Sequence, residues 1–143
     1  MRLTSITANR HVFDGQVNGK PLRLLLSFDN GQSLRLGVAG GGSGMLADNL
    51  PLDSPFEMGD CGNLVVEDLT GSLFSDLSAA DVAEVRALEL DAREVGVQLV
   101  LGVGQAFHFW VEDDELFWGD GAALTTHDWL DRGIPAAGRT IEI

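Results

Sequence analysis

The stretch Leu22-Arg-Leu-Leu-Leu-Ser-Phe-Asp-Asn-Gly-Gln-Ser-Leu-Arg-Leu-Gly-Val38 predicts two β-strands, because two apolar runs flank the turn signal Asp29-Asn-Gly31. A two-residue loop would place Leu26 opposite Arg35. A three-residue loop, with its glycine in the left-handed bulge position, places Leu26 opposite Leu34 instead. We predict the three-residue loop, because it keeps one face of the hairpin apolar and a slip of one residue would not.

The three-residue loop also pairs Leu24 with Leu36. This hairpin is the last part of a β-meander that we predict for the N-terminal third of the chain. A second turn signal, Asn18-Gly19, separates it from the preceding runs. The strands that we expect in this part of the chain are Leu3–Ala8, Val12–Val17, Leu22–Phe28 and Ser33–Val38.

The middle of the chain is rich in glycine, proline and acids, and one short strand is expected there, at Asn63–Glu67. Ser78-Ala-Ala-Asp81 resembles a capping box, and apolar residues recur at helical spacing over 82–95. This pattern favours a helix. The alternation of Leu88 and Leu90 leaves a strand from Val85 as the alternative.

The C-terminal part predicts a second group of strands. Val95–Val103 is apolar on both faces and is expected to be a central strand. A hairpin of residues 105–112 and 115–119 follows it, then a short helical turn over 125–131 and an edge strand at Thr140–Ile143. We therefore predict a mainly β (α+β) fold, either a curled antiparallel sheet or a β-sandwich, with one or two short helices.

Length and composition are those of a single globular domain over residues 1–143, with 45% hydrophobic residues. The N-terminus lacks an apolar run of signal-peptide length, and no stretch is long enough to span a membrane. Cys61 is the only cysteine, which excludes an intramolecular disulfide, and we expect it to be buried or half-buried. These features predict a cytoplasmic protein. Only one of the nine basic residues, Lys20, is a lysine, and this bias towards arginine is typical of bacterial proteins from GC-rich genomes.

The charge of the chain is strongly negative, with 22 acidic against 9 basic side chains and a formal charge of −13. Such a field repels nucleic acid and attracts basic surfaces. The acids concentrate in two stretches, twelve from Asp48 to Glu94 and seven from Glu112 to Asp131. We therefore expect an acidic side, built from the middle and C-terminal parts, that binds a basic protein.

The hairpin of residues 105–119 is the candidate binding site, because aromatic side chains lie on both of its faces and acids lie at its tip. With Asp113-Asp114 as the loop, Phe109 faces Trp118, Val111 faces Leu116 and Trp110 faces Phe117. One interpretation is purely structural: both faces are buried and the acids form a solvated tip. In the functional interpretation the hairpin binds a basic partner. The candidate partner-binding residues are Trp110, Glu112, Asp113, Asp114, Glu115, Phe117 and Trp118.

Other motifs give no catalytic, metal or cofactor site. The glycine cluster Gly40–Gly44 lacks the lysine of a phosphate loop and is expected to be a flexible surface loop. His11, His108 and His127 do not have the spacing of a metal site, and no nucleophile elbow is present. We therefore expect a protein that is not an enzyme and binds no cofactor or metal.

The most concrete function that the sequence supports is that of an immunity or antitoxin-type inhibitor, covering a basic partner enzyme such as a toxin or nuclease. One alternative is a small-molecule binding domain with an aromatic-lined pocket at Trp110, Phe117 or Trp118. A second alternative is a homodimeric assembly module joined through the hairpin. A small enzyme that uses His108 or His127 with a neighbouring carboxylate is a third.

Overall fold

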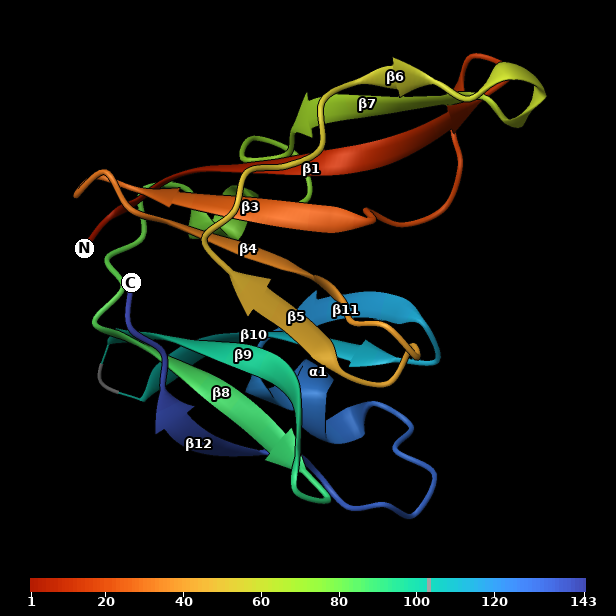
Figure 1. The fold of residues 1–143 in the computed structure, drawn as a ribbon. Coiled ribbons are helices and arrows are strands. Elements are labelled where there is room, and N and C mark those ends of the chain that lie inside the picture. Colours follow the sequence, from red (N-terminus) through yellow and green to blue (C-terminus); the bar gives the residue numbers. More distant parts are fainter. Residues whose placement is uncertain (103) are drawn as a thin grey trace. The chain divides into compact units, whose positions relative to one another are not determined.

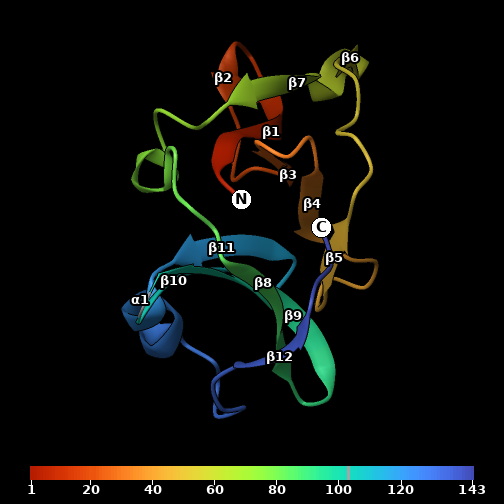
Figure 2. The ribbon, with the colours of Figure 1, turned by 90° about the vertical axis from the view of Figure 1, so that its left-hand side faces the viewer.

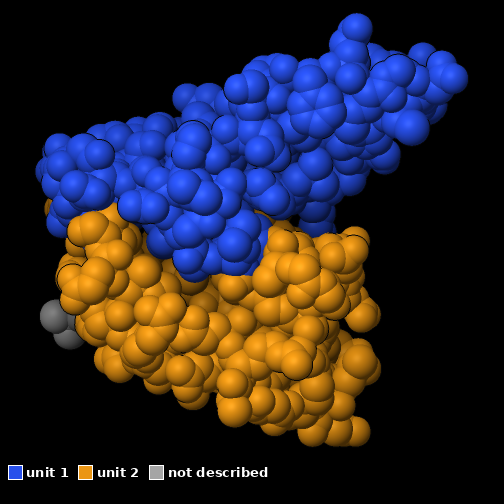
Figure 3. Space-filling view, in the orientation of Figure 1, with its two compact units in different colours: residues 1–37, 46–80 blue, residues 38–45, 81–143 orange. Residues whose placement is uncertain are grey.

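A computed structural model describes residues 1–102 and 104–143 of the chain. Its described part is mainly β, with two antiparallel sheets and one short α-helix, as predicted (Figure 1). The chain divides into two compact units (Figure 3). Unit 1 comprises residues 1–37 and 46–80, and unit 2 comprises residues 38–45 and 81–143. No helix among the described residues is long and apolar enough to cross a membrane.

The first sheet lies mostly in unit 1, and its strand order is β5-β4-β3-β1-β7-β6, with β2 paired to β1. Its core side chains include Ile6, Leu24 and Leu26, which are fully buried. Two 3-10 turns, η1 (Gly59–Cys61) and η2 (Ser75–Leu77), flank its last part. The strands are β1 (Leu3–Phe13), β2 (Gln16–Val17), β3 (Arg23–Phe28), β4 (Ser33–Val38), β5 (Met45–Asp48), β6 (Phe56–Glu57) and β7 (Asn63–Asp68).

The β3–β4 hairpin has the predicted register. Leu24 pairs with Leu36 and Leu26 with Leu34, and Gly31 has a φ of 81° in the bulge position. The strand predicted at Asn63–Glu67 is also present, as β7. The register follows from burial, because all four of these leucines are in the core.

The strand predicted at Val12–Val17 is wrong as a single strand: its first residues continue the predicted Leu3–Ala8 strand as β1, and its last two form β2, which pairs back on β1. β1 continues to Phe13 because β7 pairs with it from Thr7 to Val12. The chain then reverses at Asp14-Gly15, where both residues have positive φ, 53° and 77°. An Asp-Gly pair is a strong signal for such a two-residue turn, and the prediction overlooked it.

The second sheet belongs to unit 2 and has the order β11-β10-β9-β8-β12. Figure 2 shows it as a curved sheet with α1 beside β10. Trp110, Leu124 and Trp129 form a core cluster with Leu88, Leu90 and Val95 on the face that α1 covers. The elements are β8 (Glu84–Leu90), β9 (Arg93–Gly102), β10 (Gln105–Glu112), β11 (Glu115–Gly119), α1 (Gly121–Thr126) and β12 (Ala136–Thr140).

The helix predicted over 82–95 is wrong, and the alternative strand is right. Residues 84–90 form β8, which pairs with β9 on one side and β12 on the other. Asp91 and Ala92 both have positive φ, 54° and 60°, and make a two-residue turn between β8 and β9. Pairing on both edges of β8 outweighs the helical spacing, because intrinsic propensity is weak beside tertiary contacts.

The central strand, the short helix and the edge strand predicted for the C-terminal part are all present, but the helix and the edge strand lie at other residues than predicted. β9 is the central strand, and Val103, the last residue of that prediction, lies outside the described residues. The helical turn predicted over 125–131 is displaced, because Asp120 caps α1 by accepting a hydrogen bond from the Ala123 N–H at 2.9 Å. The edge strand lies at Ala136–Thr140 and not at Thr140–Ile143, because it pairs with β8 from Glu89 to Arg86.

Candidate functional site: the acidic end of unit 2

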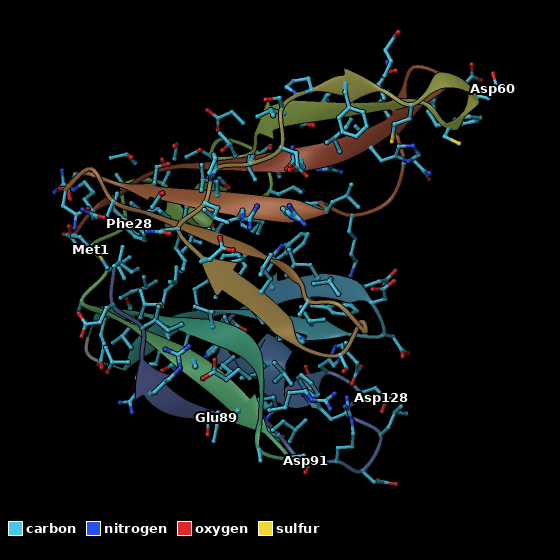
Figure 4. All side chains as sticks on the ribbon, viewed as in Figure 1. Met1, Phe28, Asp60, Glu89, Asp91 and Asp128 are labelled. Carbon is cyan, nitrogen blue, oxygen red and sulfur yellow. The ribbon has the colours of Figure 1, made fainter. Side chains whose placement is uncertain are left out.

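Two turns and one connecting segment of unit 2 meet at the same end of its sheet. β8 and β10 both run antiparallel to β9, so the turns that follow them lie at one end. The segment 127–135 reaches this end as well, because Ala136 pairs with Glu89 near the end of β8. We call the carboxylates gathered there the acidic end; Figure 4 labels two of them, Asp91 and Asp128. Its members are Asp91, Asp113, Asp114, Asp128 and Asp131.

The carboxylates of the acidic end are all exposed, and none of them forms an ion pair within the described part of the chain. Unit 2 as a whole carries 13 acidic and 4 basic residues, a formal charge of −9. Like charges crowded in this way are relieved by salt or by a basic partner.

The four arginines of unit 2 are all engaged elsewhere. Arg139 binds Glu94 through two hydrogen bonds of 2.5 and 2.9 Å, which holds the pKa of that carboxyl below its usual range. Arg86 donates two hydrogen bonds to the Gly138 carbonyl, and Arg93 donates to the Ser43 hydroxyl. Arg132 binds Glu112. None of these arginines therefore forms an ion pair with a carboxylate of the acidic end in the described part of the chain, and Arg132, the one that lines the groove there, is paired with Glu112.

The tip of the β10–β11 hairpin has the predicted two-residue loop. Asp113 and Asp114 have φ values of 51° and 63°, and the register pairs Trp110 with Phe117 and Phe109 with Trp118 as expected. The Asp114 N–H donates a 2.9 Å hydrogen bond to the carbonyl of Gly42, in the glycine-rich segment. This bond ties the main chain of the tip to the segment Gly41–Ser43.

Glu112, one of the predicted partner-binding residues, is used inside unit 2. Its carboxylate accepts from His127 Nε2 at 2.6 Å and pairs with Arg132 through its other oxygen. The Glu112 side chain is only 12% exposed and that of His127 only 14%. The His127 ring in turn packs edge-on against Trp110 and Phe117. The network therefore joins the hairpin to the segment that follows α1.

The predicted aromatic anchors lie in or near the core. Trp110 is 2% exposed and stacks on Phe117, whose centroid is 6.1 Å away. Phe117 and Trp118 are half-buried, whereas Glu115 is exposed like Asp113 and Asp114. Trp110 therefore has no surface to offer a partner in this structure, and the exposed part of the predicted site is its acidic tip.

A groove of about 790 Å³ runs beside the tip. Val111 lines it from the hairpin, while Ser43 and Arg132 line both this groove and a smaller adjoining hollow of about 190 Å³. Leu130, which is 65% exposed, stands at its edge. Leu130, Arg93 and Arg132 are not among the predicted site residues, because no local pattern shows that their segments reach the hairpin.

The other candidate residues are not gathered at this end. His11 contacts the Cys61 carbonyl oxygen in unit 1, and Cys61 itself is exposed, contrary to the prediction. His127 is hydrogen-bonded to Glu112, and no hydroxyl or thiol in the described part of the chain bonds to its ring. No cluster of three or more His, Cys, Asp or Glu side chains suited to a metal ion occurs within residues 1–102 and 104–143.

Comparison of the chain with protein-family models, with curated protein sequences and with solved structures finds no match.

Proposed function

We propose that the chain acts by binding a basic protein through the acidic end of unit 2. The most concrete form of this function is that of an immunity or antitoxin-type inhibitor, which covers a basic enzyme such as a nuclease. The observation that supports the proposal is a group of exposed carboxylates without ion-pair partners among the described residues, next to a groove with an exposed leucine at its edge.

The charge of this surface favours rapid association. Opposite charges on two proteins steer their encounter and raise association rates to about 10⁸–10⁹ M⁻¹s⁻¹ at low salt, against about 10⁵–10⁶ without steering. An inhibitor that must reach its enzyme before the enzyme acts benefits from that gain. It needs no catalytic residues of its own.

The hairpin geometry supports a preformed binding surface. The tip is held by the Asp114–Gly42 hydrogen bond on one side and by the Glu112–His127 bond at its base. A surface fixed before binding loses little conformational entropy when the partner docks. Leu130, which is exposed, would supply the apolar contact that is predicted from the sequence for Trp110.

The test begins with capture of basic proteins from the lysate of the source cell on the immobilised chain at low and high salt. Each captured protein is then purified, its enzymatic activity is assayed with and without the chain, and binding is measured over a salt series. We expect one basic enzyme that is inhibited, with an affinity that falls steeply as salt rises.

The variant Asp113→Asn/Asp114→Asn should weaken this binding, mainly through a slower association rate. The matched control Asp60→Asn/Asp76→Asn removes the same charge from exposed positions of unit 1 and should leave the affinity close to that of the wild type. Equal effects of the two variants, or binding that does not change with salt, would contradict the proposal.

A further inference from the structure

Two Asn-Gly pairs lie in exposed connections of unit 1, Asn18-Gly19 between β2 and β3 and Asn30-Gly31 between β3 and β4. An asparagine followed by glycine is prone to lose its side-chain amide, because a residue without a Cβ lets its own main-chain nitrogen approach the asparagine Cγ closely. The two pairs have the same sequence. A difference in their reactivity in the folded protein must therefore come from the contacts around them.

Hydrogen bonds hold both reacting groups of the Asn30-Gly31 pair. The Gly31 N–H donates to the Phe28 carbonyl at 3.2 Å, and the Asn30 side-chain oxygen accepts from the Gln32 N–H at 3.0 Å. The nitrogen of Gly31 must give up the proton that it shares with Phe28 before it can attack, and the Asn30 side chain must leave its bond to residue 32. These two bonds therefore protect Asn30.

The reacting groups of the Asn18-Gly19 pair are not held in this way. No described residue accepts a hydrogen bond from the Gly19 N–H, and the Asn18 side-chain oxygen accepts none within the described part of the chain. Apart from its chain neighbours, nothing lies within 4 Å of the position of a Cβ on Gly19. Arg10 donates to the Gly19 carbonyl at 3.2 Å, which steadies this residue without engaging its nitrogen.

His11 lies beside the nitrogen that leaves Asn18. Its Nε2 bonds to the Cys61 carbonyl oxygen, which can only accept, so the hydrogen-bond network assigns the proton of the neutral ring to Nε2. Nδ1 then accepts from the Asn18 side-chain nitrogen, 3.1 Å away. This bond need not break during attack, because it involves the leaving nitrogen and not the Cγ. When the ring is protonated, Nδ1 can donate a proton to that nitrogen as it departs.

We propose that Asn18 is a site of spontaneous deamidation in the folded protein and that its contacts protect Asn30. The Gly19 nitrogen loses its proton to a base in the solvent and bonds to the Asn18 Cγ. The bond from Cγ to Nδ2 breaks, and the nitrogen leaves as ammonia with a proton from His11. Water then opens the cyclic imide at one of its two carbonyls, which gives aspartate or isoaspartate without any oxidation or reduction.

Either product changes the connection between β2 and β3. The new carboxylate adds a negative charge at residue 18 and replaces the amide that donates to His11. Isoaspartate also passes the main chain through the former side chain, which lengthens the connection by a methylene group. All of these changes fall in unit 1, so the inference is independent of partner binding by unit 2.

The test is incubation of the purified full chain in warm, mildly alkaline buffer, followed by digestion and mass spectrometry of the peptides that contain Asn18 and Asn30. Deamidation is read from the gain in mass, and isoaspartate from chromatographic separation of the isomeric peptides. We expect Asn18 to react about tenfold faster than Asn30 or more, because two hydrogen bonds of ordinary strength hold only the latter pair. Equal rates in the folded chain would overturn the proposal.

The same incubation in concentrated urea is the control, because it removes the contacts and keeps the sequence. There the two asparagines should react at similar rates. If Asn18 keeps its full advantage in urea, the difference comes from the sequence and the proposal is wrong.

The variant His11→Gln tests the part played by the ring. Glutamine keeps a side chain that forms hydrogen bonds but supplies no proton at neutral pH, so Asn18 should react severalfold more slowly. Asn30 in the same chain is the matched control and should keep its rate, and a melting curve shows that the variant is folded. An unchanged rate at Asn18 in the folded variant would contradict the role of His11.

Discussion

Replacement of Glu112 by alanine should destabilise the protein, although it removes one negative charge from unit 2, which has a formal charge of −9. The lost bond to His127 joins two side chains that are only 12% and 14% exposed, and a bond of this kind is worth about 1.5–3 kcal/mol. The pair with Arg132, whose side chain is 39% exposed, is screened by solvent and contributes about 0.2–1 kcal/mol. The expected loss is therefore about 2–4 kcal/mol.

Relief of charge repulsion acts in the opposite direction, but a surface charge change is worth about 0.5 kcal/mol or less. Asp113→Asn, one residue further along the hairpin, removes the same charge from an exposed position and should leave the stability unchanged within that limit. Glu112→Gln keeps an acceptor but loses the charge and should lie between the two. At about 3–4 °C per kcal/mol for a chain of this size, the alanine variant should melt about 6–16 °C below the wild type.

Urea unfolding followed by tryptophan fluorescence measures this difference, because Trp110 and Trp129 both touch the His127 ring. A double-mutant cycle with His127→Ala should show a coupling energy of about 1 kcal/mol or more between Glu112 and His127. If Glu112→Ala and Asp113→Asn have the same stability, or the coupling is zero, the network does not hold the hairpin as described.

Three further predictions concern stability. Burial lowers the pKa of His108 in the folded state, so as the pH falls the unfolded chain binds a proton at His108 before the folded chain does. The stability of the protein should therefore fall as the pH drops below 6.5, the ordinary pKa of histidine. Urea titrations at several pH values should show that His108→Phe loses this dependence. The pKa of Asp48 in the folded state is lowered chiefly by its hydrogen bond from Arg35. The contribution of Asp48 to the free energy of unfolding should therefore be complete above pH 3.8 and lost as the pH falls through the lower pKa of the folded state. In an acid titration, Asp48→Asn should lose stability less steeply than the wild type. A Cβ at Gly96 would overlap the Phe109 carbonyl oxygen and lie 3.1 Å from the Trp110 Cα, so Gly96→Ala should destabilise the protein by about 1–3 kcal/mol or more. A Cβ at Gly102, on the same strand, meets nothing closer than 3.9 Å, so Gly102→Ala should be tolerated. Thermal melts compare the two variants, and equal melting temperatures would contradict the prediction.

The hairpins were predictable because their signals are local. Alternating burial and the turn residues fix the pairing of Leu26 with Leu34, and the same argument places Asp113 and Asp114 at a tip. The 82–95 segment was not predictable in this way. Its apolar residues fit a helix and a strand about equally, and the choice is made by β9 and β12, which lie later in the sequence.

For the candidate site, the exposed acidic residues could be predicted from the sequence, but the burial of the neighbouring aromatic side chains could not. The exposed positions of Asp113, Asp114 and Glu115 agree with a solvated tip. Burial of Trp110 follows from the packing of Trp129 and His127, which approach it only after the chain has passed through α1. Such contacts depend on tertiary structure, and a single sequence gives no spacing from which to derive them.

The placement of residues 38–45 in unit 2 has a consequence for synthesis on the ribosome. This segment leaves the ribosome early, but the groups it bonds to, Arg93 and Asp114, are made about fifty to seventy residues later. Unit 1 is therefore complete in sequence by Ala80 while this loop still lacks its partners. For the same reason, no single cut in the chain separates the two units, and a fragment that begins at Asp81 lacks one wall of the groove at the acidic end.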